Sequence, residues 1–223
     1  ISEDIDYTLT RSLSEVRQEV EEKIKSSGVF VEITKDKDVE GFVRLVIHYP
    51  TFRAEKGKIF IDLNERGGLL LEPEEHHIVH FYPENIPSFS IPTLHSKEMM
   101  AEKMAAAIGR NRPRDHFDLY KIIRHSFPLD LELVKQKCIS SGDEFDIIKM
   151  FNKAQRLKKR WDSDLAPLLV EQITFQEVMS TLAKHFNLKH EKEKRKRIDD
   201  EIRNSESYKK LLKNISSLIE KLP

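Results

Sequence analysis

The sequence predicts an α+β protein, in which a strand-rich first part is followed by a helical second part. Up to about residue 93, short apolar runs of strand length follow an early amphipathic helix, and beyond it apolar residues recur at helical spacing. Strands and helices that occupy separate parts of a chain are typical of α+β folds. We therefore divide the 223-residue chain into a sheet region, 1–93, and a helical region, 94–223.

The early helix is predicted over about residues 12–26, because Leu13, Val16, Val20 and Ile24 follow each other at spacings of three and four. Gly28 ends it. Polar or glycine-bearing turns at 35–38 and 56–57 then separate three β-rich runs, which we interpret as a meander over 29–33, 41–49 and 58–64. A further extended stretch covers 69–82.

Helices are predicted in the second part from apolar spacing and from residues that favour helix. Asp143 and Thr174 are candidate N-caps for two of them. The predicted helices cover about 96–108, 114–125, 131–140, 144–157, 175–186 and 190–222.

Composition limits the classes of partner. Lys and Arg total 38, as do Asp and Glu, so no overall field recruits nucleic acid or an anionic membrane, and any such partner needs a local patch. The single cysteine, Cys138, cannot form an internal disulfide, so we expect a reducing cytoplasm. No run approaches the roughly 20 apolar residues that span a bilayer, so we expect no membrane partner.

Acidic residues near the start are the first candidates for chemistry. Asp4 and Asp6 share one face if the chain is extended there, and two carboxylates that converge would bind a hard divalent cation such as Mg²⁺. Asp62 could join them if its strand is the neighbour. The alternatives are a solvated strand end for the pair and a polar position on an exposed sheet face for Asp62, and spacing alone favours these alternatives.

A second group of candidates lies in the helical part. Lys103 lies on a predicted helix rich in small residues, Ala101 to Ala107, and the segment Arg114-Asp115-His116-Phe117-Asp118 begins the next predicted helix. Structure alone could explain this segment: Asp115 suits the first turn of a helix, and Arg114 can pair with Asp118 at i, i+4.

Four segments, taken together, resemble successive motifs of the AbiEii/AbiGii-type nucleotidyltransferase toxins. They are Ile1 to Tyr7, Ala101 to Lys103, Arg114 to Tyr120 and Trp161 to Leu165, in the family's order. The resemblance implies a polymerase-β-like nucleotidyltransferase fold, with a mixed sheet followed by a helical C-terminal region. It also implies the toxin half of an abortive-infection or type IV toxin–antitoxin pair, restrained by a cognate antitoxin.

The resemblance also implies roles for individual residues. Asp4 and Asp6 would hold Mg²⁺ and the triphosphate, with Asp62 as the third acid. Lys103 would neutralise phosphate charge, and Asp118 would organise the site. The implied nucleotide-binding residues are Ser2, Lys103, Arg114 and Asp115. The implied reaction moves a nucleoside monophosphate from a nucleoside triphosphate to a hydroxyl of RNA, tRNA included, or of protein.

One departure from the family keeps another function open. The family carries a Gly-Gly-Thr/Ser turn before the Asp-x-Asp strand, where glycines let backbone amides approach phosphates, and this sequence begins after that position. We therefore expect a missing upstream segment, and Gly67-Gly68 is no substitute. The alternatives are a non-catalytic nucleotide-binding or protein-interaction module with the same fold, and an RNA-binding helical protein.

Weaker signals have competing interpretations. His76 and His80 could bind zinc, although surface histidines on a hairpin are the favoured interpretation. Trp161 could stack on a base, or pack inward, which we favour. The basic residues Arg110, Arg112, Arg114 and 158–160 could bind RNA phosphates beside it, or form a solvated helical surface, which we favour. The run 192–197 is basic, but acidic neighbours favour a solvated, ion-paired helix. The apolar stripe over 208–222 could close the core or dock a partner.

Overall fold

The computed structural model describes residues 4–52, 55–80 and 84–219. The chain forms two compact units, one of residues 1–109 with 128–145 and one of residues 110–127 with 146–223. Strands give way to helices after Thr93, as the sequence predicts. The units divide the chain elsewhere, because 128–145 returns to the first unit.

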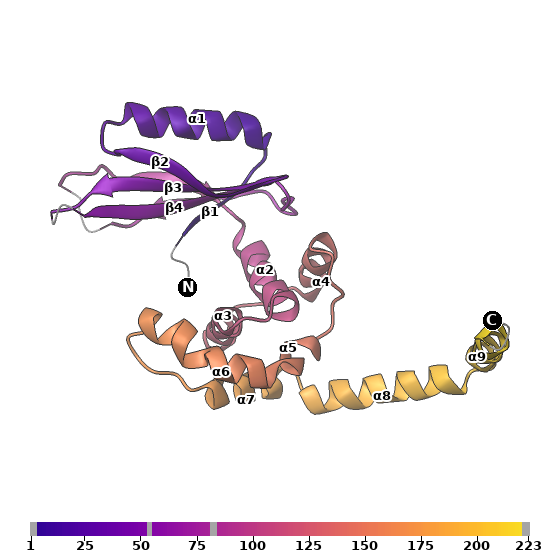
Figure 1. Cartoon of the computed structure of the whole chain (residues 1–223). Helices are drawn as coiled ribbons and strands as arrows, with labels where there is room; N and C mark the ends of the chain where they lie inside the picture. Colours follow the sequence, from indigo (N-terminus) through magenta and orange to yellow (C-terminus); the bar gives the residue numbers. More distant parts are fainter. Residues whose placement is uncertain (1–3, 53–54, 81–83, 220–223) are drawn as a thin grey trace. The chain divides into compact units, whose positions relative to one another are not determined.

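A mixed four-stranded sheet forms the first unit's larger layer (Figure 1). The strands are β1 (Ile5–Thr8), β2 (Glu32–Val39), β3 (Phe42–Pro50) and β4 (Lys56–Asn64), in the spatial order β1-β4-β3-β2. β2, β3 and β4 form the predicted antiparallel meander, whereas β1 runs parallel to β4. A parallel pair needs a long connection, and the chain between β1 and β4 contains both a helix and the meander.

Helix α1 (Leu13–Ser26) lies over one face of this sheet (Figure 1). Ser12 caps it by accepting a hydrogen bond from the backbone N–H of Glu15. Val16 and Val20 pack against buried Val43, Leu45 and Leu63, with further apolar side chains around them. Since side chains alternate along a strand, Arg44 and Asp62 belong to the opposite face.

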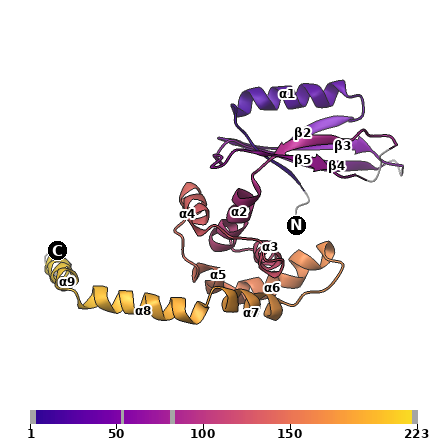
Figure 2. The ribbon, with the colours of Figure 1, turned by 180° about the vertical axis from the view of Figure 1, so that it is seen from behind.

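Two helices and a hairpin complete the first unit. The hairpin pairs β5 (Glu74–Ile78) with β6 (Phe89–Thr93) (Figure 2 labels β5), and α2 (Ser96–Gly109) packs against α4 (Leu131–Ser140). Glu98 of α2 is fully buried and accepts the N–H groups of Leu70 and Leu71 at 2.9 and 2.8 Å. Lys137 of α4 forms an ion pair with Glu98 and donates to the Gly68 carbonyl at 2.9 Å. These buried charges connect α2, α4 and the 68–71 loop.

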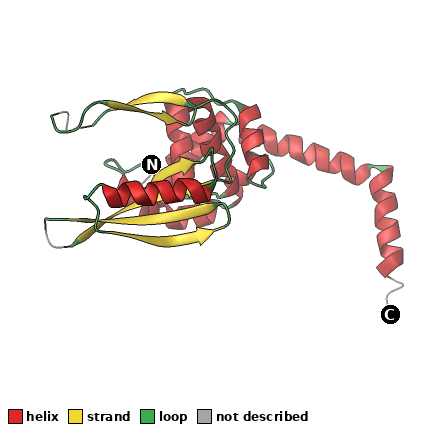
Figure 3. Cartoon of the chain, turned by 90° about the horizontal axis from the view of Figure 1, so that it is seen from above, coloured by secondary structure: helices red, strands yellow, loops and turns green. Residues whose placement is uncertain are grey.

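The second unit is helical (Figure 3). Its helix α3 (Pro113–Arg124) packs against α6 (Ala154–Leu165) and α7 (Phe175–His185). Leu119, Leu157, Val178 and Leu182 are buried in its core. The other helices are α5 (Lys149–Asn152), the short 3-10 helix η1 (Ala166–Leu168), α8 (Leu188–Asn204) and α9 (Glu206–Ile219).

Several predicted elements differ from the structure. The turn predicted at 56–57 is the start of β4, and within the described part of the stretch 69–82 only Glu74–Ile78 form a strand. The turn predicted at 35–38 is part of β2, which pairs with β3 around an irregularity between Lys35 and Lys37, and the reversal instead lies at Gly41, with φ of 68°. The helix predicted over 144–157 is divided into α5 and α6. Asp143 caps neither, because the N-cap positions of α5 and α6 are Ile148 and Lys153.

The helix predicted over 190–222 is also two helices, α8 and α9, with an extended Ser205 between them. Residues 220–222 of that prediction lie outside the described residues. In the described part of the chain, no helix is both long enough and apolar enough to cross a membrane.

Candidate active site

Arg44 and two of the predicted acids meet on the sheet face opposite α1. Arg44 and Asp62 are register partners on antiparallel strands β3 and β4. The Arg44 Nε donates to Asp62 Oδ1 at 2.6 Å, and its Nη2 donates to Asp62 Oδ2 at 2.6 Å. The same Nη2 donates to Asp4 Oδ2 at 2.9 Å. One guanidinium therefore joins carboxylates that are far apart in the sequence.

Burial decides between the two interpretations of Asp62. The residue is 7% exposed, so the interpretation as a polar position on an exposed sheet face is wrong. Asp62 is also the register partner of Asp6 on parallel strand β1, as a third acid beside the Asp-x-Asp pair requires. Asp4 precedes Asp6 by two residues, which is the same-face spacing of a strand.

Sequence analysis missed Arg44. The sequence feature that could have identified it is a single charged residue within the apolar run Phe42 to Ile47. Because side chains alternate along a strand, this residue faces away from α1. The hydrogen bonds that Arg44 donates to Asp62 raise the pKa of Arg44 above its usual value, so the guanidinium is permanently charged. Its guanidinium carbon also lies 5.7 Å from the centre of the Phe60 ring.

The chemistry of these carboxylates fits a divalent cation, but their number does not. Within the described residues, no three His, Cys, Asp or Glu side chains are grouped closely enough to hold a metal. However, one positively charged nitrogen already contacts oxygens of both Asp4 and Asp62. Carboxylate oxygens are the ligands that Mg²⁺ prefers, so the chemistry of these two donors fits a divalent ion, whereas their number in this arrangement does not.

Lys103 is half-buried on α2, in the same unit as the carboxylates. Its helix buries the small side chains Ala101, Ala105 and Ala107, which is typical of close packing. Ser2 lies outside the described residues.

The start of α3 carries the remaining predicted residues. The Asp115 carboxylate accepts the N–H of Arg112 at 3.1 Å and a hydrogen bond from Arg110 at 2.6 Å. Its side chain is only 5% exposed, so these contacts give Asp115 a structural role at the helix start. Arg114 and Asp118 are half-buried on the same helix. Their part in a nucleotide site stays a prediction, as does that of Asp115.

Buried polar groups attach the start of α3 to the chain around α5. His116 is fully buried, and its ring nitrogens lie 3.0 Å from the Arg112 carbonyl and 2.9 Å from the Met150 carbonyl. Asn111 donates from Nδ2 to the Lys149 carbonyl at 2.7 Å. This segment therefore has a demanding structural role besides any role in chemistry.

Trp161 packs inward, so the base-stacking hypothesis is wrong. The residue is 2% exposed, its indole N–H donates to the Ile173 carbonyl at 2.8 Å, and its ring meets Phe175 edge to face at 5.5 Å.

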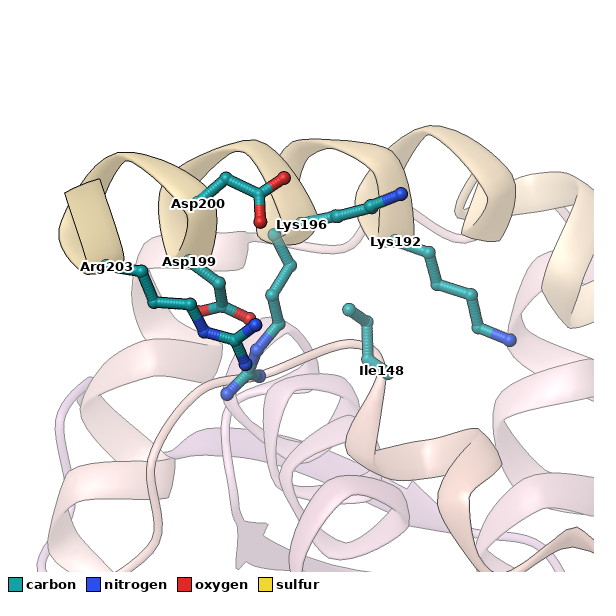
Figure 4. Close-up of a pocket in the computed structure, with 7 residues that line it drawn as sticks. Ile148, Lys192, Lys196, Asp199, Asp200 and Arg203 are labelled. Atoms are coloured by element: carbon teal, nitrogen blue, oxygen red, sulfur yellow. The ribbon is translucent and has the colours of Figure 1, made fainter.

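The basic run 192–197 lies along one wall of a shallow hollow of about 310 Å³ on α8. Figure 4 shows Lys192, Lys196 and Arg203 beside Asp199 and Asp200. Arg195 forms an ion pair with Asp146. The mixed charges agree with a solvated, ion-paired helix rather than a basic binding patch.

Comparisons with known proteins give consistent results. The sequence pattern of the family described as "Nucleotidyl transferase AbiEii toxin, Type IV TA system" matches residues 1–218. The chain is similar in structure to JHP933 from Helicobacter pylori, with a TM-score of 0.51 and 16% identity over 92% of this chain and 82% of that chain. A putative nucleotidyltransferase from H. pylori gives a TM-score of 0.51 and 16% identity over 86% and 79%. No curated protein matches. At this identity, the structural likeness concerns the fold.

Proposed function

Because the chain belongs to the nucleotidyl transferase AbiEii toxin family of type IV toxin–antitoxin systems, we propose that it transfers a nucleoside monophosphate from a nucleoside triphosphate to a hydroxyl group, with Mg²⁺ as cofactor. The acceptor is a hydroxyl of RNA or of protein. A cognate antitoxin restrains the activity, and the reducing cytoplasm is the expected location.

The observation that carries this proposal is the convergence of Asp4 and Asp62 on one positive nitrogen, with Asp6 beside Asp62 in register. A site that holds a guanidinium between two carboxylates from different strands is arranged to hold positive charge. When bound there, Mg²⁺ would supply charge neutralisation for the triphosphate and for the leaving pyrophosphate.

The chain's own residues have distinct parts in the proposed reaction. Asp4, Asp6 and Asp62 would hold the cation. Lys103 binds the triphosphate and offsets its charge, and Asp118 helps to organise the metal, the lysine or the acceptor. Phosphoryl transfer depends mainly on positioning and electrostatic stabilisation, so the protein needs no covalent intermediate.

The test combines the protein from its complete coding frame with Mg²⁺, one labelled nucleoside triphosphate at a time, and total RNA and protein. The test variant is Asp4→Asn with Asp6→Asn. Asp36→Asn with Asp38→Asn is the matched control, because these acids have the same spacing on exposed β2. We expect wild type and the control to label an acceptor, and the test variant and chelator-treated protein to label none.

A second candidate function is a non-catalytic nucleotide-binding module. The ion pairs of Arg44 favour it, because they satisfy Asp4 and Asp62 without a metal. In that case, the wild type would bind nucleotide without labelling any acceptor. Equal labelling by wild type and the test variant would remove Asp4 and Asp6 from the site.

A further inference from the structure

Four arginines line a small pocket in the second unit. Arg110, Arg112, Arg156 and Arg160 surround a cavity of about 220 Å³ at the start of α3 and along α6. The other lining residues are Asn111, Pro113 and Leu157. In the sequence, the residues that line the pocket are far from Asp4, Asp6 and Asp62. Neither the family description nor the titles of the structural neighbours assign a ligand to the pocket.

The pocket carries an excess of positive charge. Arg110 pairs with Asp115 at 2.6 Å and Arg160 pairs with Asp164 at 2.8 Å, although both arginine side chains are about half exposed. Arg112 and Arg156 are exposed, and neither forms an ion pair with the part of the chain that the structure describes. In a chain with zero net charge, two uncompensated guanidinium groups at one cavity indicate an anion. Arg offers several N–H donors in a planar arrangement that suits phosphate.

Asn111 supplies an independent observation. It is 6% exposed, lines the pocket, and adopts a left-handed backbone with φ of 57°. Its Nδ2 is used by the Lys149 carbonyl, whereas its Oδ1 is buried with no hydrogen-bond partner among the described residues. A buried acceptor without a donor costs free energy, and strained backbone in a non-glycine residue is typical of functional positions.

The arginines restrict the ligand. An ionised phosphate has only acceptors, so it suits guanidinium groups, which have only donors. Asn111 Oδ1 is closed to solvent, so a ligand in the pocket does not contact that oxygen in this structure. The cavity is smaller than the roughly 300 Å³ at which pockets for drug-sized ligands begin, so it suits part of a nucleotide rather than a whole one.

We propose that this pocket binds a phosphate group of a ribonucleotide. The choice of a ribonucleotide rests on the proposed function, whereas the phosphate chemistry rests on the arginines. The ligand has two sources, an RNA strand or a free nucleotide, and the arms of the experiment separate them.

The test measures binding without metal, so that it does not depend on nucleotidyl transfer. The probes are a fluorescein-labelled 12-nucleotide single-stranded RNA, ATP and inorganic phosphate. The test variant is Arg112→Gln with Arg156→Gln. Lys209→Gln with Lys210→Gln is the matched control, because it removes the same charge from exposed positions of α9 outside the pocket. Circular dichroism and thermal melting confirm that each variant is folded.

We expect the arginine variant to weaken RNA or ATP binding about tenfold or more, with a shallower dependence on salt, and the lysine variant to change it less than about threefold. Weaker RNA binding by the arginine variant identifies an RNA strand as the source. Weaker ATP binding by that variant, with no RNA binding by wild type, identifies a free nucleotide. No binding by wild type, equal loss in both variants, or inorganic phosphate competing as well as ATP would overturn the proposal. If wild type binds RNA or ATP in this pocket but transfers no nucleotide, only the proposed function is overturned.

Discussion

Arg44 and Asp62 form a two-point ion pair between neighbouring antiparallel strands, with both Nε–Oδ1 and Nη2–Oδ2 distances at 2.6 Å. Asp62 is buried and Arg44 is partly buried, so water screens the pair incompletely. Asp4 joins the pair through the same Arg44 nitrogen. This relationship gives the acidic face a fixed geometry before any ligand arrives.

Replacing Arg44 tests whether its guanidinium occupies the cation position. We expect Arg44→Gln to lower the free energy of unfolding by about 2 kcal/mol without divalent ions, because it removes both hydrogen bonds and the positive charge that the guanidinium gives to buried Asp62. Divalent ions should restore stability, so Mn²⁺ should raise the melting temperature more in this variant than in wild type. Arg17→Gln is the control, since it removes one arginine from α1 on the other sheet face. Equal Mn²⁺ effects in wild type and Arg44→Gln would contradict the expectation.

Lys103 is expected to act on the triphosphate rather than on folding. Lys103→Ala should lower kcat/KM for transfer about a hundredfold or more, since it removes a charge that stabilises the transition state. The unfolding free energy should change by less than about 1 kcal/mol, because no large apolar cavity forms. Lys97→Ala, on an exposed position of the same helix, should leave kcat/KM unchanged. Steady-state kinetics and urea unfolding measure both effects, and a loss of stability that matches the loss of activity would argue against a direct role.

Glu98 should make stability depend on pH. Burial acts to raise the pKa of Glu98, but hydrogen bonds from Lys137 and from the N–H groups of Leu70 and Leu71 outweigh it and hold the pKa below the usual range. A lowered folded-state pKa means that the charged form's contribution is present above the unfolded pKa of about 4.3, and is lost as pH falls through the folded value. Glu98→Gln should therefore cost about 2 kcal/mol at pH 7 and progressively less below about pH 4.

Thermal melting of wild type and Glu98→Gln between pH 7 and pH 3 measures this dependence. Glu102→Gln is the comparison, because Glu102 also binds Lys137 at 2.8 Å from a more exposed position. It should cost less than about 1 kcal/mol. A difference between Glu98→Gln and wild type that stays constant with pH would refute the assignment.

Trp161 is expected to stabilise the second unit without contacting nucleic acid. Trp161→Phe removes the hydrogen bond to the Ile173 carbonyl and part of a buried ring, so unfolding should become easier by about 1–2 kcal/mol. RNA affinity, measured by fluorescence anisotropy, should stay within about twofold of wild type. A selective loss of RNA affinity at unchanged stability would restore the base-stacking hypothesis.

Local spacing was enough to predict much of the fold. The apolar periods predict α1, the meander, and helices such as α2, α4 and α7 within a few residues of their observed bounds. Periodicity did not reveal the division of 144–157 and 190–222 into shorter helices. The two divisions lie at Lys153, whose backbone is not helical, and at Ser205, which is extended between two helices.

The candidate site was predicted only in part, for a physical reason. The Asp-x-Asp spacing and the order of the motifs are visible in the sequence itself, so Asp4, Asp6 and the family resemblance could be predicted from it. The pairing of Arg44 with Asp62, the burial of Trp161 and the grouping of four arginines join residues that are far apart in the chain. Strand register and helix packing decide such pairings, and a shift of one residue would move Arg44 to the α1 face.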